Sequence, residues 1–467
     1  MLKVDHAVVI GGGFSGTLLA INLLRHGSLR VTIIEKRADR LGRGLAYGAA
    51  QEGHILNVRA ANMSALPDQP GHFVEWLKKQ GMGGEGSFAT RRDYGAYLCA
   101  LLQEVSSHAP GRLTALTDDA VDLLRTEAGV RVMLRSGGHV DADVAALAPG
   151  NLPPHDMAAF SGINSSAYVN DPWAQDVAEG LQPADEILLL GSGLTAVDCA
   201  LSLENAGFRG RITALSRRGL APHDHRAPSP YAPRNERPTG SLSSFVQQIR
   251  TRSAEIGWRG AVDELRPFIQ DMWRAATTDE RSRFLRHLRP YWDVHRHRIA
   301  PQVAERLGRM RADGRLQVRA GTLVKVVPEG TSLVVALRAR GQTKVEALHV
   351  ARVINCTGPL GDLHRTREPL LQRLAERGDI RPDPLSIGID VDRQCRAIAS
   401  DGTAQQRLFV VGPMTRGAHW GDRRGSRHPP AGLGARARDH RRTLGRSGRA
   451  VGRVPKAGQP DLPLLLT

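Results

Sequence analysis

Short apolar runs alternate with longer amphipathic segments in the first part of the chain. Residues 7–10 are an apolar run that leads directly into three glycines, and residues 31–34 are a second apolar run. Between them, residues 17–25 place leucines on one face of a helix. A buried strand, a tight glycine turn, a helix and a second strand in this order predict the first half of a parallel dinucleotide-binding unit.

The first glycine turn has the spacing G-x-G-x-x-G. Gly11 would allow the tight turn, Gly13 would leave room for a pyrophosphate, and Gly16 would let the helix approach the strand. Glu35 ends the second strand, 22 residues after Gly13, where an acid binds a ribose hydroxyl in such units. These four residues therefore predict a dinucleotide site; a glycine turn without a ligand is the alternative.

A second turn of the same kind follows the apolar run at residues 187–190. Gly191, Gly193 and Ala196 fit the spacing G-x-G-x-x-A, and residues 197–203 continue as a helix. Two such fingerprints in one chain predict two bound dinucleotides, or one dinucleotide and a decayed copy of the site.

The strand after the second turn, residues 211–215, is followed by arginines rather than by an acid. Arg217 and Arg218 are suited to hold the 2′-phosphate of NADPH. The alternative is a pair of solvated surface arginines. Both readings stay open, so the second cofactor is predicted as NAD(P)H.

Periodicity also predicts the elements between and after the two turns. Residues 72–77 and 91–105 have the pattern of amphipathic helices, and residues 113–144 alternate as in a three-stranded β-meander. Residues 241–311 are predicted as a helical insertion, which holds much of the scarce aromatic content.

Composition limits the class of protein. The chain has 467 residues, of which 41% are hydrophobic, enough for two or three domains with packed cores. The sequence contains no run of about 18 apolar residues, so no membrane-spanning helix is expected. The N-terminal residues do not have the pattern of a signal peptide. The expectation is a cytoplasmic protein without a membrane partner.

The four cysteines contain no C-x-x-C pair, which argues against a disulfide framework, a cysteine zinc site and a dithiol redox centre. His223, Asp224 and His225 have a spacing that could serve a metal, but no further ligand cluster accompanies them. The prediction is therefore no metal site, with these three as polar loop residues near the nicotinamide.

Three segments between the two turns carry a resemblance to a known family. They are GRGLAYG at residues 42–48, HILNV at 54–58 and MSALPDQPGHFVEWL at 63–77. These motifs resemble those of bacterial FAD/NAD(P)-binding flavoproteins, a family similar in plan to flavin N-hydroxylases. Within that family the chain most resembles a FAD-dependent urate hydroxylase, over residues 4–420.

The resemblance implies an α/β fold with two Rossmann-like dinucleotide-binding domains. It implies that FAD binds at residues 1–180 and 353–420, and NAD(P)H at residues 181–352, with the helical insertion at about 241–311. Asn57 and Met63 lie in the shared motifs and would contact the cofactor. Gly412 follows a strand and would bring the chain back to the flavin.

FAD and NAD(P)H together predict an oxidoreductase in which the nicotinamide reduces the flavin and the flavin reduces a second acceptor or O2. The resemblance implies a monooxygenase that hydroxylates urate to 5-hydroxyisourate in purine breakdown. One alternative is another flavin oxidoreductase, such as an amine N-hydroxylase. The other is a basic nucleotide-binding protein that is not an enzyme.

A basic cluster stands in the helical region, between a tryptophan and a proline. Its residues His295, Arg296 and His297 predict a pocket for a planar anion such as urate, and they are the candidate catalytic residues. The alternative is a helix whose charged face pairs with acids of the FAD domain. The cluster is short and lies in no nucleic-acid motif, so no nucleic-acid partner is predicted.

The net charge of +17 is concentrated at the end of the chain. Residues 421–467 contain ten arginines and one lysine against three aspartates, a net charge of +8, and they show no apolar period. A one-base insertion near the Trp420 codon would account for this basic tail, because the shifted frame restores residues typical of the resembled family. The tail charge would then have no functional meaning.

Overall fold

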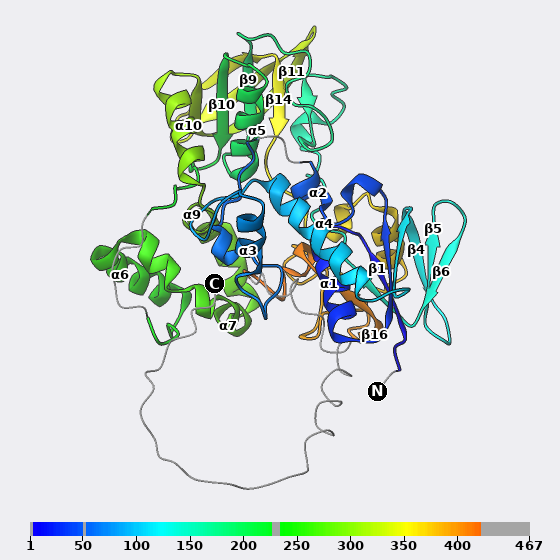
Figure 1. The fold of residues 1–467 in the computed structure, drawn as a ribbon. Coiled ribbons are helices and arrows are strands. Elements are labelled where there is room, and N and C mark those ends of the chain that lie inside the picture. Colours follow the sequence, from blue (N-terminus) through cyan, green and yellow to red (C-terminus); the bar gives the residue numbers. More distant parts are fainter. Residues whose placement is uncertain (1–2, 50–52, 227–233, 422–467) are drawn as a thin grey trace, which may run out of the picture.

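The computed structural model describes residues 3–49, 53–226 and 234–421, and the basic tail predicted after Trp420 lies outside them apart from Gly421. Two β-sheets, each covered by helices, form the two main units, and a group of helices lies beside them (Figure 1). This arrangement confirms the predicted α/β fold with two Rossmann-like sheets.

The first sheet is assembled from both ends of the chain, in the order β15-β16-β7-β1-β2-β3. The central strand β1 pairs in parallel with β2 and β7, and β16 pairs in parallel with β7. The C-terminal third of the chain therefore completes the first unit. The bounds are β1 His6–Ile10, β2 Arg30–Glu35, β3 Leu113–Thr117, β7 Val144–Leu147, β15 Arg396–Ile398 and β16 Ala404–Val410.

Both faces of this sheet are buried. Its central strands are continuous apolar runs, which is typical of parallel strands covered on both faces. Val9 and Ile33 face a core formed with α1 and α4, whereas Val8 and Ile34 face a second core that includes α11. Helices α1 and α4 contact each other. The helices of this unit are α1 Phe14–His26, α2 Gly44–Gly48, α3 His72–Lys79, α4 Arg91–Ser107 and α11 Pro369–Glu376.

The predicted β-meander is shifted by one strand. Its first expected strand, β3, joins the main sheet beside β2, and the three-stranded sheet consists of the next three strands. Strand pairing explains the difference, because Leu113–Thr117 pair in parallel with Val31–Glu35 and so make β3 the edge strand of the main sheet. The small sheet contains β4 Ala120–Arg125, β5 Val130–Leu134 and β6 His139–Ala142.

The second sheet repeats the plan, in the order β13-β12-β11-β10-β9-β14-β8. Strand β9 pairs in parallel with β10 and β14, whereas β12 and β13 extend the sheet as antiparallel strands. Helix α5, Leu194–Asn205, follows β9. The strands are β8 Tyr168–Val169, β9 Glu186–Leu190, β10 Arg211–Ser216, β11 Leu316–Glu329, β12 Ser332–Ala339, β13 Val345–Val350 and β14 Arg352–Asn355.

Helices fill the segment between β10 and β11. Helices α6, α7 and α9 lie outside the second sheet in Figure 1, below its strands. Helix α10 instead packs into the core of the second sheet through Val303, Leu307 and Met310. The bounds are α6 Leu242–Asp263, interrupted at Gly257, α7 Ile269–Ala275, α8 Thr278–Arg283, α9 Arg289–Arg296 and α10 Pro301–Ala312.

Within the described ranges, no helix combines the length and the apolar composition needed to cross a bilayer.

Candidate active site

The two glycine turns are built with the same steric constraint. Gly11 has φ +102°, and a Cβ there would lie 2.3 Å from the carbonyl oxygen of Ala148. Gly191 has φ +116°, and a Cβ there would lie 2.4 Å from the carbonyl oxygen of Cys356. The first turn thus packs against the residue that follows β7, and the second turn against the residue that follows β14. Only glycine fits at either position.

The helices that follow both turns begin without a side-chain cap. Gly13 precedes α1 and Gly193 precedes α5, and neither helix receives a hydrogen bond from a capping side chain. Their first N–H groups therefore remain available to an anion at the positive end of the helix dipole. No atom lies within 4 Å of a Cβ built on Gly193, so the second turn has space where a pyrophosphate would approach.

The third position of each fingerprint brings helix and strand together. A Cβ on Gly16 would lie 1.9 Å from the carbonyl oxygen of Gly11, so the start of α1 touches the turn itself. Ala196 takes the corresponding position in α5 and is buried. The second fingerprint therefore accommodates one methyl group at this position.

Glu35 is tied to the first turn by the backbone. Its Oε2 accepts a hydrogen bond from the N–H of Gly12 at 2.8 Å, and its Oε1 accepts one from the N–H of Arg37 at 3.2 Å. The corresponding end of β10 carries Ser216, whose hydroxyl bonds to that of Ser192 at 2.8 Å. The two turns thus have a similar backbone conformation, but the residues where a ribose would lie differ in charge.

A second glycine-rich loop lies on the first turn. The N–H of Gly42 donates to the carbonyl oxygen of Gly12 at 2.8 Å. Gly44 has φ +57°, and a Cβ there would lie 2.8 Å from Cα of Gly13. The motif at residues 42–48 therefore packs against the first glycine turn, a contact that its sequence did not reveal.

The turn at Gly412 returns to the same place. Gly412 has φ +89°, and a Cβ there would lie 2.6 Å from Oγ of Ser15, in the first turn of α1. A short 3₁₀ helix, Pro413–Thr415, follows it. The described chain therefore passes beside the first dinucleotide turn again just before it ends at residue 421.

Asn57 and Met63 lie in different surroundings. The carbonyl oxygen of Asn57 accepts a hydrogen bond from Nε2 of His225 at 2.9 Å, which joins the first unit to the loop after β10. The His225 ring also packs on Phe88, with centroids 5.1 Å apart. Met63 is 5% exposed and packs in the hydrophobic core of the first unit.

Arg217 and Arg218 stand at the end of β10, as expected. Arg217 is exposed. Arg218 donates to the carbonyl oxygen of Arg286 at 3.3 Å, and its guanidinium lies 5.7 Å from the centre of the Tyr291 ring. The helical insertion thus borders the place where the ribose of the second cofactor would lie.

The basic cluster lies at the C-terminal end of α9, where its first member packs among other rings. The His295 ring packs against His223, with centroids 4.6 Å apart, and stacks on Trp258 at 5.8 Å. Burial and the neighbouring basic groups, His223 first among them, lower the pKa of His295 to about 4. Its imidazole is therefore neutral at pH 7, and its buried Nδ1 has no hydrogen-bond partner among the described residues.

His297 and the residue after it lie beside acids within the insertion. His297 lies 3.7 Å from Asp293, which also accepts a hydrogen bond from Arg289 at 3.2 Å. The next residue, Arg298, is buried and pairs with Asp263 of α6 at 2.8 Å. The acids that neutralise this helix are therefore local, a pairing that sequence spacing alone did not indicate.

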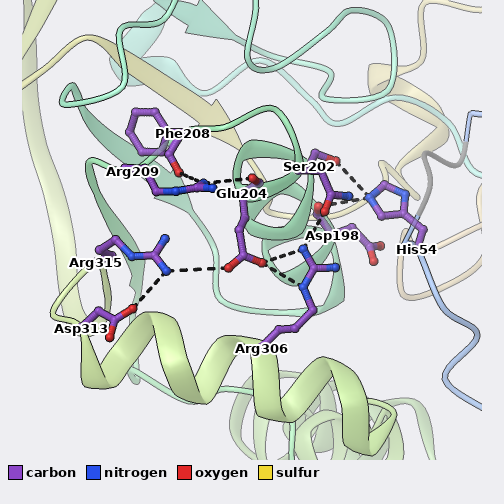
Figure 2. Close-up of polar contacts among 10 residues, drawn as sticks. His54, Asp198, Ser202, Glu204, Phe208, Arg209, Arg306, Asp313 and Arg315 are labelled. Atoms are coloured by element: carbon purple, nitrogen blue, oxygen red, sulfur yellow. Dashed lines mark hydrogen bonds and ion pairs between the residues drawn. The ribbon is translucent and has the colours of Figure 1, made fainter.

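Polar contacts along α5 join the two units (Figure 2). Nε2 of His54, from the first unit, lies 3.0 Å from Oγ of Ser202 and 3.2 Å from the carbonyl oxygen of Asp198. Arg91 at the start of α4 forms an ion pair of 2.7 Å with Asp198, whose side chain is 7% exposed. These contacts fix the second turn relative to the first.

Glu204, farther along α5, ties this helix to α10. It accepts hydrogen bonds from Arg306 at 2.6 and 2.9 Å, and Arg315 lies 3.7 Å away (Figure 2). The same helix therefore links the second sheet to the first unit at one end and to α10 at the other.

Two cysteines lie together where sequence spacing predicted none. Sγ of Cys199 in α5 is 3.7 Å from Sγ of Cys356, and both thiols are buried and reduced. They are 157 residues apart in the chain, so no local motif could reveal them. The hydrogen bond between them, together with burial, raises the pKa of the Cys199 thiol well above its usual value.

His223, Asp224 and His225 do not gather further ligands. Asp224 pairs with Arg259 at 2.5 Å, and the two histidines face His295 and Asn57. Within the described part of the chain, no group of three His, Cys, Asp or Glu side chains is arranged to hold a metal ion.

A known protein family matches the first part of the chain. Residues 8–152 match a family model described as FAD-NAD(P)-binding. The match covers the first turn, the loop at residues 42–48 and the return through β7. It confirms the expectation of an FAD/NAD(P)-binding flavoprotein, with FAD and NAD(P)H as the cofactors.

One curated relative is the nitrosuccinic acid synthase npaA of Aspergillus oryzae, at 23% identity over 317 residues. The match covers 57% of this chain, and the chain spans 47% of the length of that relative.

Solved structures share the fold over nearly the whole chain. The L-lysine 6-monooxygenase of Pseudomonas syringae has a TM-score of 0.63 at 18% identity, covering 93% of this chain and 97% of that one. DfoA, the cadaverine monooxygenase of Erwinia amylovora, has a TM-score of 0.64 at 13% identity, covering 99% and 100%. At these identities the likeness shows a common fold.

Proposed function

We propose that the protein is an FAD- and NAD(P)H-dependent monooxygenase that oxygenates the nitrogen of an amine. The observation that carries the proposal is the pair of complete glycine turns, each with an uncapped helix start, in one chain. The lysine and cadaverine monooxygenases that share the fold act on amines by name, and the name of the curated relative describes a nitro compound.

In this reaction the amine, O2, NAD(P)H and one proton give the hydroxylamine, water and NAD(P)+. Bound flavin supplies the transfer of electrons from the nicotinamide to oxygen. Glu35, Gly13 and Gly412 would hold the flavin nucleotide, and Gly193 with Arg217 would hold the nicotinamide nucleotide. The hydrogen bond between His225 and Asn57 would keep the loop after β10 closed over the cleft and exclude water.

His295 has a limited role in this proposal. Because its pKa is about 4, the ring is neutral at pH 7 and holds no proton to donate as an imidazolium. Its packing between His223 and Trp258 instead orients the loop that carries His225. Arg296 and His297 remain candidate contacts of the substrate in this proposal.

The proposal is tested with the full-length protein purified with bound FAD. NADH or NADPH oxidation is followed with lysine, ornithine, cadaverine and aspartate, and the products are analysed by mass spectrometry for added oxygen on nitrogen. Hydrogen peroxide is measured in parallel, because uncoupled oxidation would also consume the nicotinamide. Stimulation by an amine without any N-oxygenated product would count against the proposal.

Urate is the second substrate to test, because the motifs at residues 42–77 resemble those of a urate hydroxylase. The comparisons with known proteins give no support to urate. Urate-dependent NAD(P)H oxidation, together with loss of urate absorbance, would favour carbon hydroxylation over amine oxygenation.

A further inference from the structure

The last described segment of the chain, residues 416–420, is held by the helical insertion. Nε1 of Trp273 in α7 donates to the carbonyl oxygen of Gly417 at 2.8 Å. Trp420 stacks on Trp273, with centroids 4.9 Å apart and planes 23° apart. Two guanidinium groups lie over this indole pair, Arg281 over Trp273 at 5.3 Å and Arg289 over Trp420 at 5.6 Å.

Arg416 adds a third guanidinium whose charge is not matched. Its Nε donates to the carbonyl oxygen of Pro413 at 3.1 Å. Its Nη2 is shielded from solvent and has no hydrogen-bond partner among the described residues. Burial, and then the positive charge of Arg289, lower the pKa of Arg416. A buried guanidinium close enough to feel the charge of another is unfavourable unless an anion compensates both.

The nearby carboxylates do not supply that anion. Asp383 is the acid that acts on Arg416, but its two oxygens accept the N–H groups of Leu385 and Ile387 at 2.9 and 2.8 Å. Asp293 is occupied by Arg289 through Nε at 3.2 Å. In the described ranges, no ion pair joins Arg416 to any carboxylate.

The segment that carries Arg416 passes beside the first glycine turn. Arg416 directly follows the short helix that begins after Gly412, and Gly412 contacts Ser15 at the start of α1. Arg289 begins α9, the helix that packs on the loop carrying His223. An anion between the two arginines would therefore lie where the first unit meets the helical insertion.

A second unsatisfied group lies on α7, which contacts the same segment. Nε2 of Gln270 in α7 donates to the carbonyl oxygen of Ala418 at 3.2 Å, whereas its Oε1 is buried without a partner among the described residues. The segment and α7 together therefore present an unfilled donor on Arg416 and an unfilled acceptor on Gln270. A molecule with a carboxylate and an N–H group could bind to both.

We infer that Arg416 and Arg289 bind a carboxylate of the substrate, so that the substrate class is an amine that carries a carboxylate group. This inference rests on the proposed amine oxygenation, to which it adds the recognition element. Arg416 would contact the carboxylate through its free Nη2, and Arg289 would contact it from α9. Gln270 would accept a hydrogen bond from an N–H group of the same molecule.

The first experiment measures binding and does not depend on turnover. Succinate, which has carboxylates but no amine to oxidise, is titrated into the FAD-loaded protein by calorimetry, and its uncharged diamide, succinamide, is titrated in parallel. We expect saturable binding of succinate and none of succinamide. Because a charge-assisted hydrogen bond is lost, Arg416→Gln should weaken succinate binding by about ten- to a hundredfold.

Two further variants separate recognition from folding. Arg289→Gln removes the partner on α9 and should weaken succinate binding in the same way, since the anion contacts both groups. Arg283→Gln is the matched control, because it removes an equal charge from an exposed position in α8 and should leave binding unchanged. Thermal unfolding and FAD absorbance show whether each variant is folded and loaded.

A second experiment links the site to the reaction. Ornithine and putrescine differ only in the α-carboxylate, so the wild-type protein should oxidise NAD(P)H faster with ornithine. If succinate binds and Arg416→Gln abolishes binding while no amine is oxygenated, the anion site stands and the proposed function fails. If amines are oxygenated equally well with and without a carboxylate, and Arg416→Gln changes neither rate nor binding, the inference alone is overturned. Loss of FAD from Arg416→Gln with unchanged succinate binding would assign the arginine to the flavin and also overturn it.

Discussion

Replacing Gly193 by alanine tests whether the second turn binds a pyrophosphate. Gly193 has φ −83° and ψ −164°, and no atom lies within 4 Å of a Cβ built there. Alanine therefore fits the folded chain without strain. The weaker N-cap preference of alanine and the lower entropy of its unfolded state oppose each other, so the free energy of unfolding should change by about 0.5 kcal/mol or less.

The effect on the cofactor should be much larger than the effect on stability. If the pyrophosphate lies against the N–H groups at the start of α5, the new methyl group moves it away from them. Losing one charge-assisted hydrogen bond costs about 1.5–3 kcal/mol, which raises the Kd for NAD(P)H by about 10- to 150-fold. FAD content should stay the same, because the first turn is unchanged.

Gly191→Ala provides the contrast. Its φ of +116° and the 2.4 Å distance from its added Cβ to the carbonyl oxygen of Cys356 make any side chain strained there. The strained backbone alone should lower stability by about 1–3 kcal/mol. The assay is thermal unfolding together with NADPH and NADH titration of the FAD-loaded protein. Wild-type nicotinamide affinity in Gly193→Ala would refute the reasoning and identify the second turn as a decayed copy.

Three other changes test separate parts of the site. Replacing Arg217 and Arg218 by alanine should weaken NADPH binding by about tenfold or more while leaving NADH binding unchanged; equal affinities for both cofactors before and after the change would show surface arginines. Asp198→Asn should lower the free energy of unfolding by about 3 kcal/mol, because it leaves Arg91 without its partner in a largely buried pair of 2.7 Å; a stability within error of wild type would contradict this, and thermal unfolding measures it. The folded-state pKa of His295 is about 4, below the ordinary 6.5, so the neutral ring stabilises the protein above pH 6.5 and that contribution is lost as the pH falls toward 4. His295→Gln should therefore flatten this part of the pH–stability curve, and parallel curves for variant and wild type would contradict the lowered pKa.

The sequence could predict features whose cause is local. Gly11, Gly16 and Gly191 are required by contacts with backbone atoms a few residues away or in the adjoining strand, so spacing alone indicates them. Glu35 was predicted in the same way, and its hydrogen bond to the N–H of Gly12 holds it at the turn. Fold class followed from these signals, because each turn needs a parallel strand on either side.

Features that depend on distant packing could not be predicted. The sulfur atoms of Cys199 and Cys356 meet only because α5 and the end of β14 flank the same turn. His225 reaches Asn57 across 168 residues of sequence. The charged run on α9 indicated a pocket, but spacing cannot say whether a basic side chain faces an acid or a substrate. Here Asp293 and Asp263 satisfy His297 and Arg298 within the insertion.

The two turns together explain why one chain can hold two similar dinucleotides in different roles. Their backbones are nearly equivalent, so steric fit at Gly11 and Gly191 cannot tell one nucleotide from the other. The two units differ in charge at the last residue of the second strand. Strand β2 ends in the negatively charged Glu35, whereas β10 ends in the neutral Ser216, which is followed by Arg217. An acid favours an unmodified ribose, whereas the neutral and basic end tolerates a phosphate. We therefore expect the residues at the strand ends, rather than the glycines, to determine which nucleotide each turn binds. Exchanging Glu35 with Ser216 and Arg217 should change the cofactor preference without changing the fold.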